Sequence, residues 1–221
     1  DGHGGVHHHD GFINVNGIFE ERFDIVLTNP PFGANVEPGD VVQETEIQTS
    51  DELRQRYVAE YGAVYEAGQK KIEAAKGKPI ASLFELPKNH QSKIKTEILF
   101  IERCLNLLKP GGRMGIVLPE GVFNNPSLSK VREFCEERAF IRAVVSLPPE
   151  TFISSGASVK ASLLFLQKFT VEEKVEFERQ QAAALAETWA AYAGQIAAEK
   201  ERKNAAIKTA KQSGGSEKLK A

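Results

Sequence analysis

The sequence has 221 residues, 41% hydrophobic and 26% charged, which is ordinary for a globular domain, and no apolar run approaches the ~18 residues of a membrane-spanning helix. The opening residues lack a signal-peptide pattern and the two cysteines form no Cys-x-x-Cys pair, so we predict a cytoplasmic protein whose cysteines are reduced and buried. A formal net charge of −2 excludes a globally basic nucleic-acid binder, so any contacts with DNA must be made by a local patch or by a partner protein.

Residues 1–22 begin with glycine and histidine and then become weakly apolar, which predicts a loop followed by a short connecting segment. The run His7-His8-His9-Asp10 contains metal-binding residue types, but adjacent loop residues seldom converge on one ion, so we predict a solvated loop and no metal site. The first residue is aspartate and no strand pattern precedes the first glycines, so we expect the chain to begin inside a longer gene product.

The first strand is predicted over residues 23–28, a short apolar run without strict alternation that is typical of a strand covered on both faces. It ends at Asn29-Pro30-Pro31-Phe32, where two prolines interrupt strand hydrogen bonding. Residues 34–95 are more polar and resemble an insertion, with a helix expected near 51–76 that begins at Ser50 or Asp51.

Strands and helices then alternate. A helix over residues 96–108 should end at Lys109-Pro110-Gly111-Gly112, and a helix near 128–138 should be capped by Ser127 or Ser129. This order favours a doubly wound α/β sheet whose last strand, following a Ser/Gly turn, could run antiparallel. The remaining strands are predicted over residues 113–119, 141–147 and 161–167.

From Val171 to Gln212 the sequence predicts a long helix or a helical pair, because it has no proline and only one glycine. One stripe of this helix carries Leu185, Trp189, Tyr192 and Ile196, which implies a partner helix within the molecule or outside it. Trp189 and Tyr192 could instead stack on bases, but their helical spacing favours a helix–helix seam. The lysines after residue 199 alternate with glutamates, which favours a solvated helix face over a DNA-binding patch.

The segment Asn29-Pro30-Pro31-Phe32 occupies the place where open α/β sheets bind ligands, beyond the carboxyl end of a strand. Its two prolines fix φ and remove two backbone donors, so we expect proline carbonyls facing a pocket without bonds of their own. The Asn29 side chain adds a carbonyl acceptor, and Phe32 adds a flat apolar face. Such a site suits a planar ring with an exocyclic amino group.

Residues 24–33 resemble the catalytic motif of adenine-N6 DNA methyltransferases, and residues 107–113 and 118–121 resemble the two motifs that follow it. Over residues 1–169 the pattern is similar to the modification (M) subunit of type I restriction-modification systems, supported by residues 122–125 and 156–166. The resemblance implies a partial Rossmann-like methyltransferase sheet. Residues 1–169 would be the C-terminal portion of the catalytic domain, residues 170–212 a helical extension and residues 213–221 a disordered tail.

The resemblance also implies roles for the motif residues. A flipped adenine would donate hydrogen bonds from N6 to the Asn29 side chain and the Pro30 carbonyl and would stack on Phe32, so the catalytic set is Asn29, Pro30, Pro31 and Phe32. The methyl donor would be S-adenosylmethionine, with Asp1 and Asn29 as cofactor-binding residues and no metal. The family's cofactor-binding glycine motif and ribose-binding acidic residue should precede the first strand, so the chain looks like the C-terminal part of an M subunit.

The implied partners are DNA, the specificity subunit and the restriction subunit of a type I complex, with no membrane. Lys160, beside the Ser/Gly turn, is the one isolated cation expected near a substrate phosphate. The alternative function is an incomplete or degenerate methyltransferase fragment that serves as an assembly module through its C-terminal helix.

Overall fold

A computed structural model describes residues 10–14, 18–43, 50–86, 93–155 and 159–212. The chain divides into two units, Asp1–Val171 and Glu172–Ala221, which we describe separately. The predicted His7–His9 loop and the predicted disordered tail at 213–221 lie outside the described residues.

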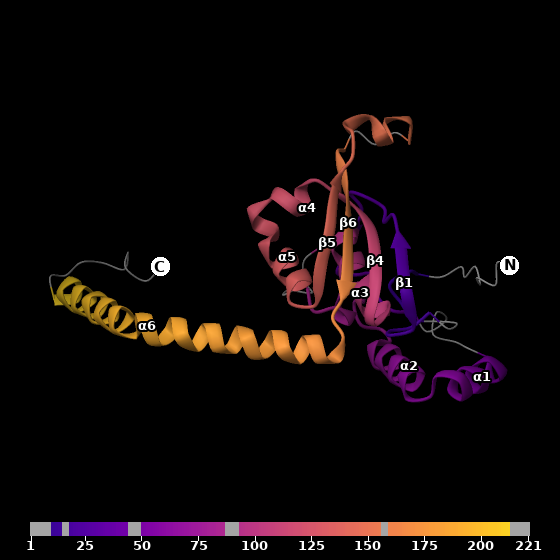
Figure 1. Cartoon of the computed structure of the whole chain (residues 1–221), viewed down its shortest axis with the longest axis horizontal. Helices are drawn as coiled ribbons and strands as arrows, with labels where there is room; N and C mark the ends of the chain where they lie inside the picture. Colours follow the sequence, from indigo (N-terminus) through magenta and orange to yellow (C-terminus); the bar gives the residue numbers. More distant parts are fainter. Residues whose placement is uncertain (1–9, 15–17, 44–49, 87–92, 156–158, 213–221) are drawn as a thin grey trace. The chain divides into compact units, whose positions relative to one another are not determined.

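The first unit is built on a four-stranded sheet in the order β1-β4-β6-β5 (Figure 1). Strands β1 and β4 are parallel, whereas β6 runs antiparallel to both of its neighbours. The predicted α/β class and the antiparallel last strand are confirmed. The strands are β1 (Phe23–Thr28), β4 (Leu108–Pro119), β5 (Ala139–Ser146) and β6 (Ala161–Lys168).

The Lys-Pro-Gly-Gly sequence does not form a separate loop. Strand β4 begins at Leu108, directly after α3 (Thr96–Leu107), so Lys109–Gly112 belong to the strand. Gly111 has a φ of 80°, which only glycine adopts readily, and the pairing of β1 with β4 shifts register between Phe23 and Ile25. Residues 109–112 are therefore part of β4, and the pairing of the strand is distorted near its start.

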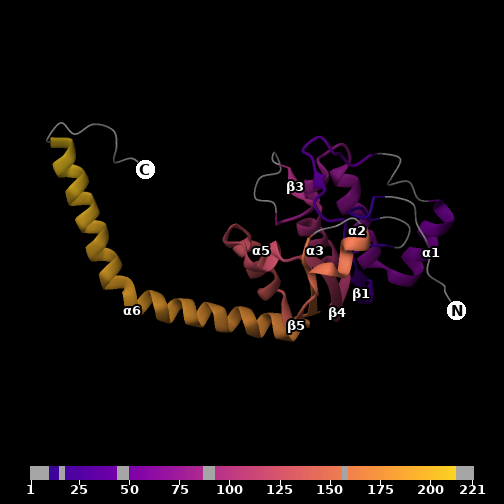
Figure 2. The same ribbon diagram turned by 90° about the horizontal axis from the view of Figure 1, so that it is seen from above.

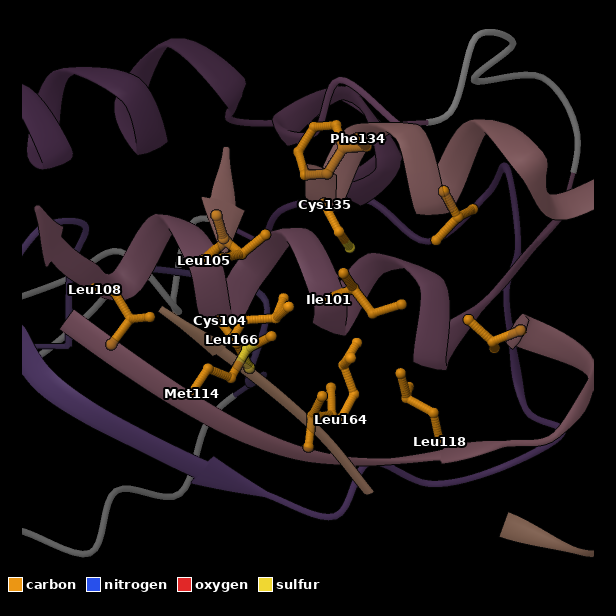
Figure 3. Close-up of a cluster of buried hydrophobic side chains, with 14 residues drawn as sticks. Ile101, Cys104, Leu105, Leu108, Met114, Leu118, Phe134, Cys135, Leu164 and Leu166 are labelled. Carbon is orange, nitrogen blue, oxygen red and sulfur yellow. The ribbon is translucent and has the colours of Figure 1, made fainter. Parts of the chain in front are cut away.

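Helices α3 and α5 (Ser129–Glu136) cover one face of the sheet. Figure 3 shows Cys104 and Leu105 of α3 in the same apolar cluster as Met114 of β4 and Leu166 of β6. Cys104 and Cys135 are both buried and free, as predicted, and burial raises the pKa of each thiol to about 12.

The opposite face of the sheet is open along β1. Ile25 is 64% exposed and Leu27 is 76% exposed. The prediction that this strand is covered on both faces is therefore wrong for the described residues, since the helices described above pack on the other face. The short apolar run correctly predicted a strand at this position. It wrongly predicted that both faces of the strand are covered.

The segment 34–95 has more structure than a polar insertion suggests. Ser50 caps its first helix by accepting a hydrogen bond from the Leu53 amide, as predicted, but the expected single helix is divided at Gly62, where φ is 52°. The segment contributes to a second apolar core with the N-terminal residues and α3. Its elements are β2 (Asn35–Val36), α1 (Asp51–Tyr61), α2 (Ala63–Ala75), the 3-10 helix η2 (Ile80–Leu83) and β3 (Ile94–Lys95).

Two buried charged residues tie α3 to its surroundings. The Glu102 carboxylate accepts hydrogen bonds from the backbone amides of Glu85 and Leu86, both at 2.8 Å. Arg103 donates to the Gly11 and Ile13 carbonyls, at 3.0 and 2.9 Å, and to the Asn14 side chain. Burial raises the pKa of Glu102 and lowers that of Arg103 to about 10. Helix α3 is thereby fixed to both the N-terminal residues and residues 85–86.

The serine cap predicted for α5 is wrong. Its N-cap is Leu128, which provides no side-chain acceptor. The Asn125 side chain instead accepts hydrogen bonds from the amide and hydroxyl of Ser127, in the short helix η3 (Pro126–Leu128) that follows α4 (Gly121–Asn124). Asn125 thus caps the short helix η3, and α5 itself has no side-chain cap.

The second unit consists of α6 (Val171–Gln212), a helix of 42 residues that bends partway along its length (Figure 2). Its predicted stripe is exposed at Leu185, Trp189 and Tyr192, with fractions of 57%, 55% and 52%. None of the helices in the described ranges is long and apolar enough to cross a membrane.

Candidate active site at the end of strand β1

The Asn29–Phe32 motif leaves the sheet at the edge where parallel strands β1 and β4 both end. Thr28, the last residue of β1, is paired with Ile116 of β4, so the motif lies beside the last residues of β4. The prolines account for the end of β1, because neither can donate to the ladder. This edge is the usual ligand-binding edge of an open α/β sheet.

Two hydrogen-bond acceptors of the motif make no hydrogen bond within the described residues. Asn29 is exposed whereas Pro30 is buried, and neither the Asn29 side chain nor the Pro30 carbonyl bonds any described residue. The Pro31 carbonyl differs, because it accepts a hydrogen bond of 2.9 Å from the Thr96 hydroxyl. The expectation of unbonded proline carbonyls is thus confirmed for Pro30 and wrong for Pro31.

Residues 95 and 96 bind the loop that follows the motif. The Lys95 ammonium donates to the Gly33 carbonyl at 3.0 Å, and the Thr96 amide donates to the Ala34 carbonyl at 3.2 Å. Gly33 has a φ of 77°, which turns the chain here and favours glycine. Sequence reasoning missed Thr96, although a threonine at the start of a predicted helix is a residue type that bonds nearby backbone groups.

Phe32 meets a second aromatic ring from a distant part of the chain. Its ring centroid lies 6.1 Å from that of Phe152, with an interplanar angle of 85°. Phe152 belongs to the 3-10 helix η4 (Pro149–Ser155), between β5 and β6. The edge-to-face arrangement is favourable and steadies the Phe32 ring. Nothing local marked Phe152, so sequence analysis did not select it.

Lys160 is not an isolated cation. Its ammonium lies 3.5 Å from the Glu120 carboxylate, which also accepts a hydrogen bond of 3.3 Å from the Ser162 hydroxyl. The Glu120 amide donates to the Lys160 carbonyl at 3.0 Å. The prediction was wrong because β6 lies beside β4 in the sheet, with Ala161 opposite Pro119, which brings the two charges together.

The structure places one of the two predicted cofactor-binding residues. Asn29 is exposed at the sheet edge, whereas Asp1 lies outside the described residues. An asparagine side chain and two aromatic rings fit the methyl-accepting base, and they do not by themselves make a site for the charged methionine end or the ribose of S-adenosylmethionine. Within the described ranges, no three His, Cys, Asp or Glu side chains gather as a metal site would require.

Comparison with known families gives one match over most of the chain. The family described as N-6 DNA Methylase matches residues 74–210. The matched range lies C-terminal to the Asn29–Phe32 motif, so the roles assigned to the motif stay predictions.

A curated relative is the type I restriction enzyme EcoEI methylase subunit of Escherichia coli, 23% identical over 171 residues that cover 76% of this chain and 26% of the relative. The chain thus spans about a quarter of that relative's length.

Three solved structures are similar to parts of the chain. A putative class I S-adenosylmethionine-dependent methyltransferase from Listeria monocytogenes is 23% identical, over 73% of this chain and 36% of its own, with a TM-score of 0.45. A chain of a type I restriction-modification complex is 28% identical, over 67% and 22%, with a TM-score of 0.40. A modification subunit of a putative type I restriction enzyme from Vibrio vulnificus is 20% identical, over 67% and 23%, with a TM-score of 0.42.

Proposed function

This chain belongs to the N-6 DNA methylase family, and we propose that it carries the adenine-binding edge of a type I restriction-modification methyltransferase that methylates adenine N6 in DNA. S-adenosylmethionine is the cofactor of this family. The observation that carries the proposal is the pair of acceptors that make no hydrogen bond within the described residues, the Asn29 side chain and the Pro30 carbonyl, next to the paired rings of Phe32 and Phe152. The name of the Escherichia coli relative supports the assignment to a type I system.

The target adenine must leave the duplex to reach this edge, because its amino group is inaccessible while the base is stacked and paired. Its two N6 hydrogens then donate to the Asn29 side-chain oxygen and the Pro30 carbonyl. Both acceptors draw positive charge to the N–H hydrogens and leave electron density on a nitrogen whose lone pair is otherwise delocalised into the ring. The Phe32 face stacks on the base, and Phe152 contacts the Phe32 ring in an edge-to-face arrangement.

When bound, S-adenosylmethionine would supply an electrophilic methyl group, whose bond to the sulfonium sulfur breaks as the bond to N6 forms, so that a neutral thioether leaves. Positive charge develops on N6 as the new carbon–nitrogen bond forms, and the Asn29 and Pro30 oxygens stabilise that charge without having to reorient. One N6 proton then passes to solvent. The prolines contribute by fixing two φ angles, so the acceptors are held in place before the base arrives.

We assign DNA reading to a partner subunit. The chain has a net charge of −2, which does not provide the excess of basic residues that a protein needs to hold a DNA duplex. The exposed stripe of α6, with Leu185, Trp189 and Tyr192, suits a helix of a specificity subunit. DNA, a specificity subunit and a restriction subunit are thus the proposed partners. The cytoplasmic location expected from the sequence stays a prediction.

The stripe is tested with Trp189→Glu in the full protein, with Ala191→Glu on another face of the same helix as the matched control. We expect Trp189→Glu to lose the specificity subunit in a pull-down at unchanged melting temperature, and Ala191→Glu to retain it. A large fall in melting temperature for Trp189→Glu would show that the stripe is internal core and would contradict the docking assignment.

The methylation proposal is tested with Asn29→Ala in the full protein, produced with its partners in a host without adenine methylation. Removing one preorganised acceptor should lower the rate of N6-methyladenine formation roughly 100-fold or more. Gln55→Ala, which removes an exposed amide on α1, is the control and should keep the wild-type rate. Equal rates for Asn29→Ala and wild type would refute the role of Asn29, and an inactive wild-type complex would favour the assembly-module alternative.

A further inference from the structure

The Thr96 hydroxyl is the only side-chain group of the described residues that bonds the Pro31 carbonyl, at 2.9 Å. We infer that Thr96 is a positioning residue for the proposed methyl transfer: its hydroxyl fixes the direction of the chain between the two acceptors and Phe32. The inference rests on the proposed function, and its test separates the two.

The proline rings leave one rotation of the motif undetermined. They fix φ of Pro30 and Pro31, but the direction of the Pro31 carbonyl depends on ψ, which the ring does not set. That same rotation decides where Phe32 lies relative to the Asn29 and Pro30 oxygens. A donor that holds the Pro31 carbonyl therefore sets the distance between the stacking ring and the acceptors.

Thr96 is well placed to be that donor. It is 7% exposed, so water has little access to its hydroxyl, whereas Pro31 itself is exposed. A hydroxyl has one proton, and the Pro31 carbonyl at 2.9 Å is closer than the Ala34 carbonyl at 3.3 Å or the Glu97 carboxylate at 3.5 Å. The Thr96 backbone amide meanwhile donates to the Ala34 carbonyl, so one residue holds both ends of the turn.

The support behind Thr96 is rigid. Threonine is β-branched, which restricts χ1 and with it the position of the hydroxyl. Helix α3 continues from Thr96 into Leu99 and Ile101, both 0% exposed, and into the buried Arg103 with its three hydrogen bonds. The hydroxyl is thus attached to one of the best-packed elements of the unit, as a preorganised site requires.

The decisive comparison is between Thr96→Val and Thr96→Ser in the full protein with its partners. Valine keeps the branched shape and removes the donor, whereas serine keeps the donor. We expect Thr96→Val to lower kcat for N6-methyladenine formation about tenfold, the effect of one lost hydrogen bond, with the KM for S-adenosylmethionine within about twofold of wild type. Thr96→Ser should retain at least about half of the wild-type kcat.

Thr209→Val is the matched control, because Thr209 also donates its hydroxyl to a backbone carbonyl, that of Ala205 in α6. It should leave kcat unchanged. If Thr96→Val does not fold, Thr96→Ala replaces it in the comparison with Thr96→Ser, and the same difference in kcat is expected. Melting temperatures of all variants distinguish a loss of turnover from a loss of folded protein.

A wild-type kcat in Thr96→Val, or an equal fall in Thr96→Val and Thr96→Ser, overturns the role of the hydroxyl while the proposed function stands. Wild-type protein that methylates a base other than adenine, or none, overturns the proposed function itself. The two failures are therefore distinct results of one series of measurements.

Discussion

Replacing Arg103 by methionine tests whether α3 is the element that holds the first unit together. The substitution keeps a long, flexible side chain and removes all the donors. Arg103 is 3% exposed and donates to the Gly11 carbonyl, the Ile13 carbonyl and the Asn14 side chain. In the variant all three acceptors lose their donor; Ile13 and Asn14 are buried, whereas Gly11 is exposed.

The magnitude follows mainly from the two buried acceptors, the Ile13 carbonyl and the Asn14 side chain. A buried polar group left without a partner costs about 1–3 kcal/mol. The sum is reduced because burial of the guanidinium is itself unfavourable, as the lowering of its pKa to about 10 indicates. We therefore expect a loss of about 3–5 kcal/mol in the free energy of unfolding, within the range for breaking a buried charged network. At about 2–4 °C per kcal/mol for a chain of this size, the melting temperature should fall by roughly 10 °C.

Urea unfolding of wild type and variant measures this loss directly. Arg54→Met, on the exposed surface of α1, is the control and should change the free energy by less than about 0.5 kcal/mol. Arg103→Lys should fall between wild type and Arg103→Met, because an ammonium cannot span three acceptors as a guanidinium fork does. A loss below about 1 kcal/mol for Arg103→Met would show that the N-terminal residues are not anchored through this side chain.

Four further predictions use other parts of the first unit. Burial raises the pKa of Cys104 and Cys135 from 9.0 to about 12. Both thiols should therefore react with a disulfide reagent at pH 8 about 1,000-fold more slowly in the folded than in the unfolded protein. Fast labelling of the folded protein would contradict their burial. The stabilisation linked to these thiols is present below pH 9 and is lost as the pH rises toward 12, so urea midpoints should fall over that window. Gly112→Ala places a Cβ 2.9 and 3.1 Å from two backbone oxygens that cannot move aside, so it should cost about 1–3 kcal/mol, whereas Gly39→Ala meets no atom within 4 Å and should be near neutral by the same urea assay. Phe152→Leu removes the edge contact with the motif's ring and should lower methylation by about 2- to 10-fold, less than the asparagine substitution does; an unchanged rate would show that this ring contributes nothing to the site.

Local signals in the sequence were sufficient to place the motif. A short apolar run, two consecutive prolines and an asparagine predicted that β1 ends at Thr28 with Asn29–Phe32 beyond it, and the structure has this arrangement. The turn before the last strand likewise indicated the antiparallel direction of β6. Such features depend on residues near one another in the chain, which is why a single sequence reveals them.

Features that depend on distant residues were missed or misread. Phe152 is 120 positions from its partner Phe32, and Lys160 meets Glu120 only because β6 lies beside β4. The division of the helix at Gly62 was also missed, since a glycine is tolerated in many helices and only its φ of 52° shows that the chain turns there. Neighbours in space, rather than local propensity, decide each of these points.

The two proline carbonyls show the limit most clearly. The sequence predicted the loss of backbone donors at Pro30 and Pro31, and that loss applies equally to both residues. Which carbonyl stays available is decided by the donors that the rest of the fold brings near, and the start of α3 brings one to Pro31 and none to Pro30. A polar group that lacks a partner within a closely bonded loop is costly for folding and useful for binding. In the proposed function, the placement of Thr96 therefore makes Pro30, rather than Pro31, the proline carbonyl left to accept from the base, which is why a substitution in α3 should change a reaction at the end of β1.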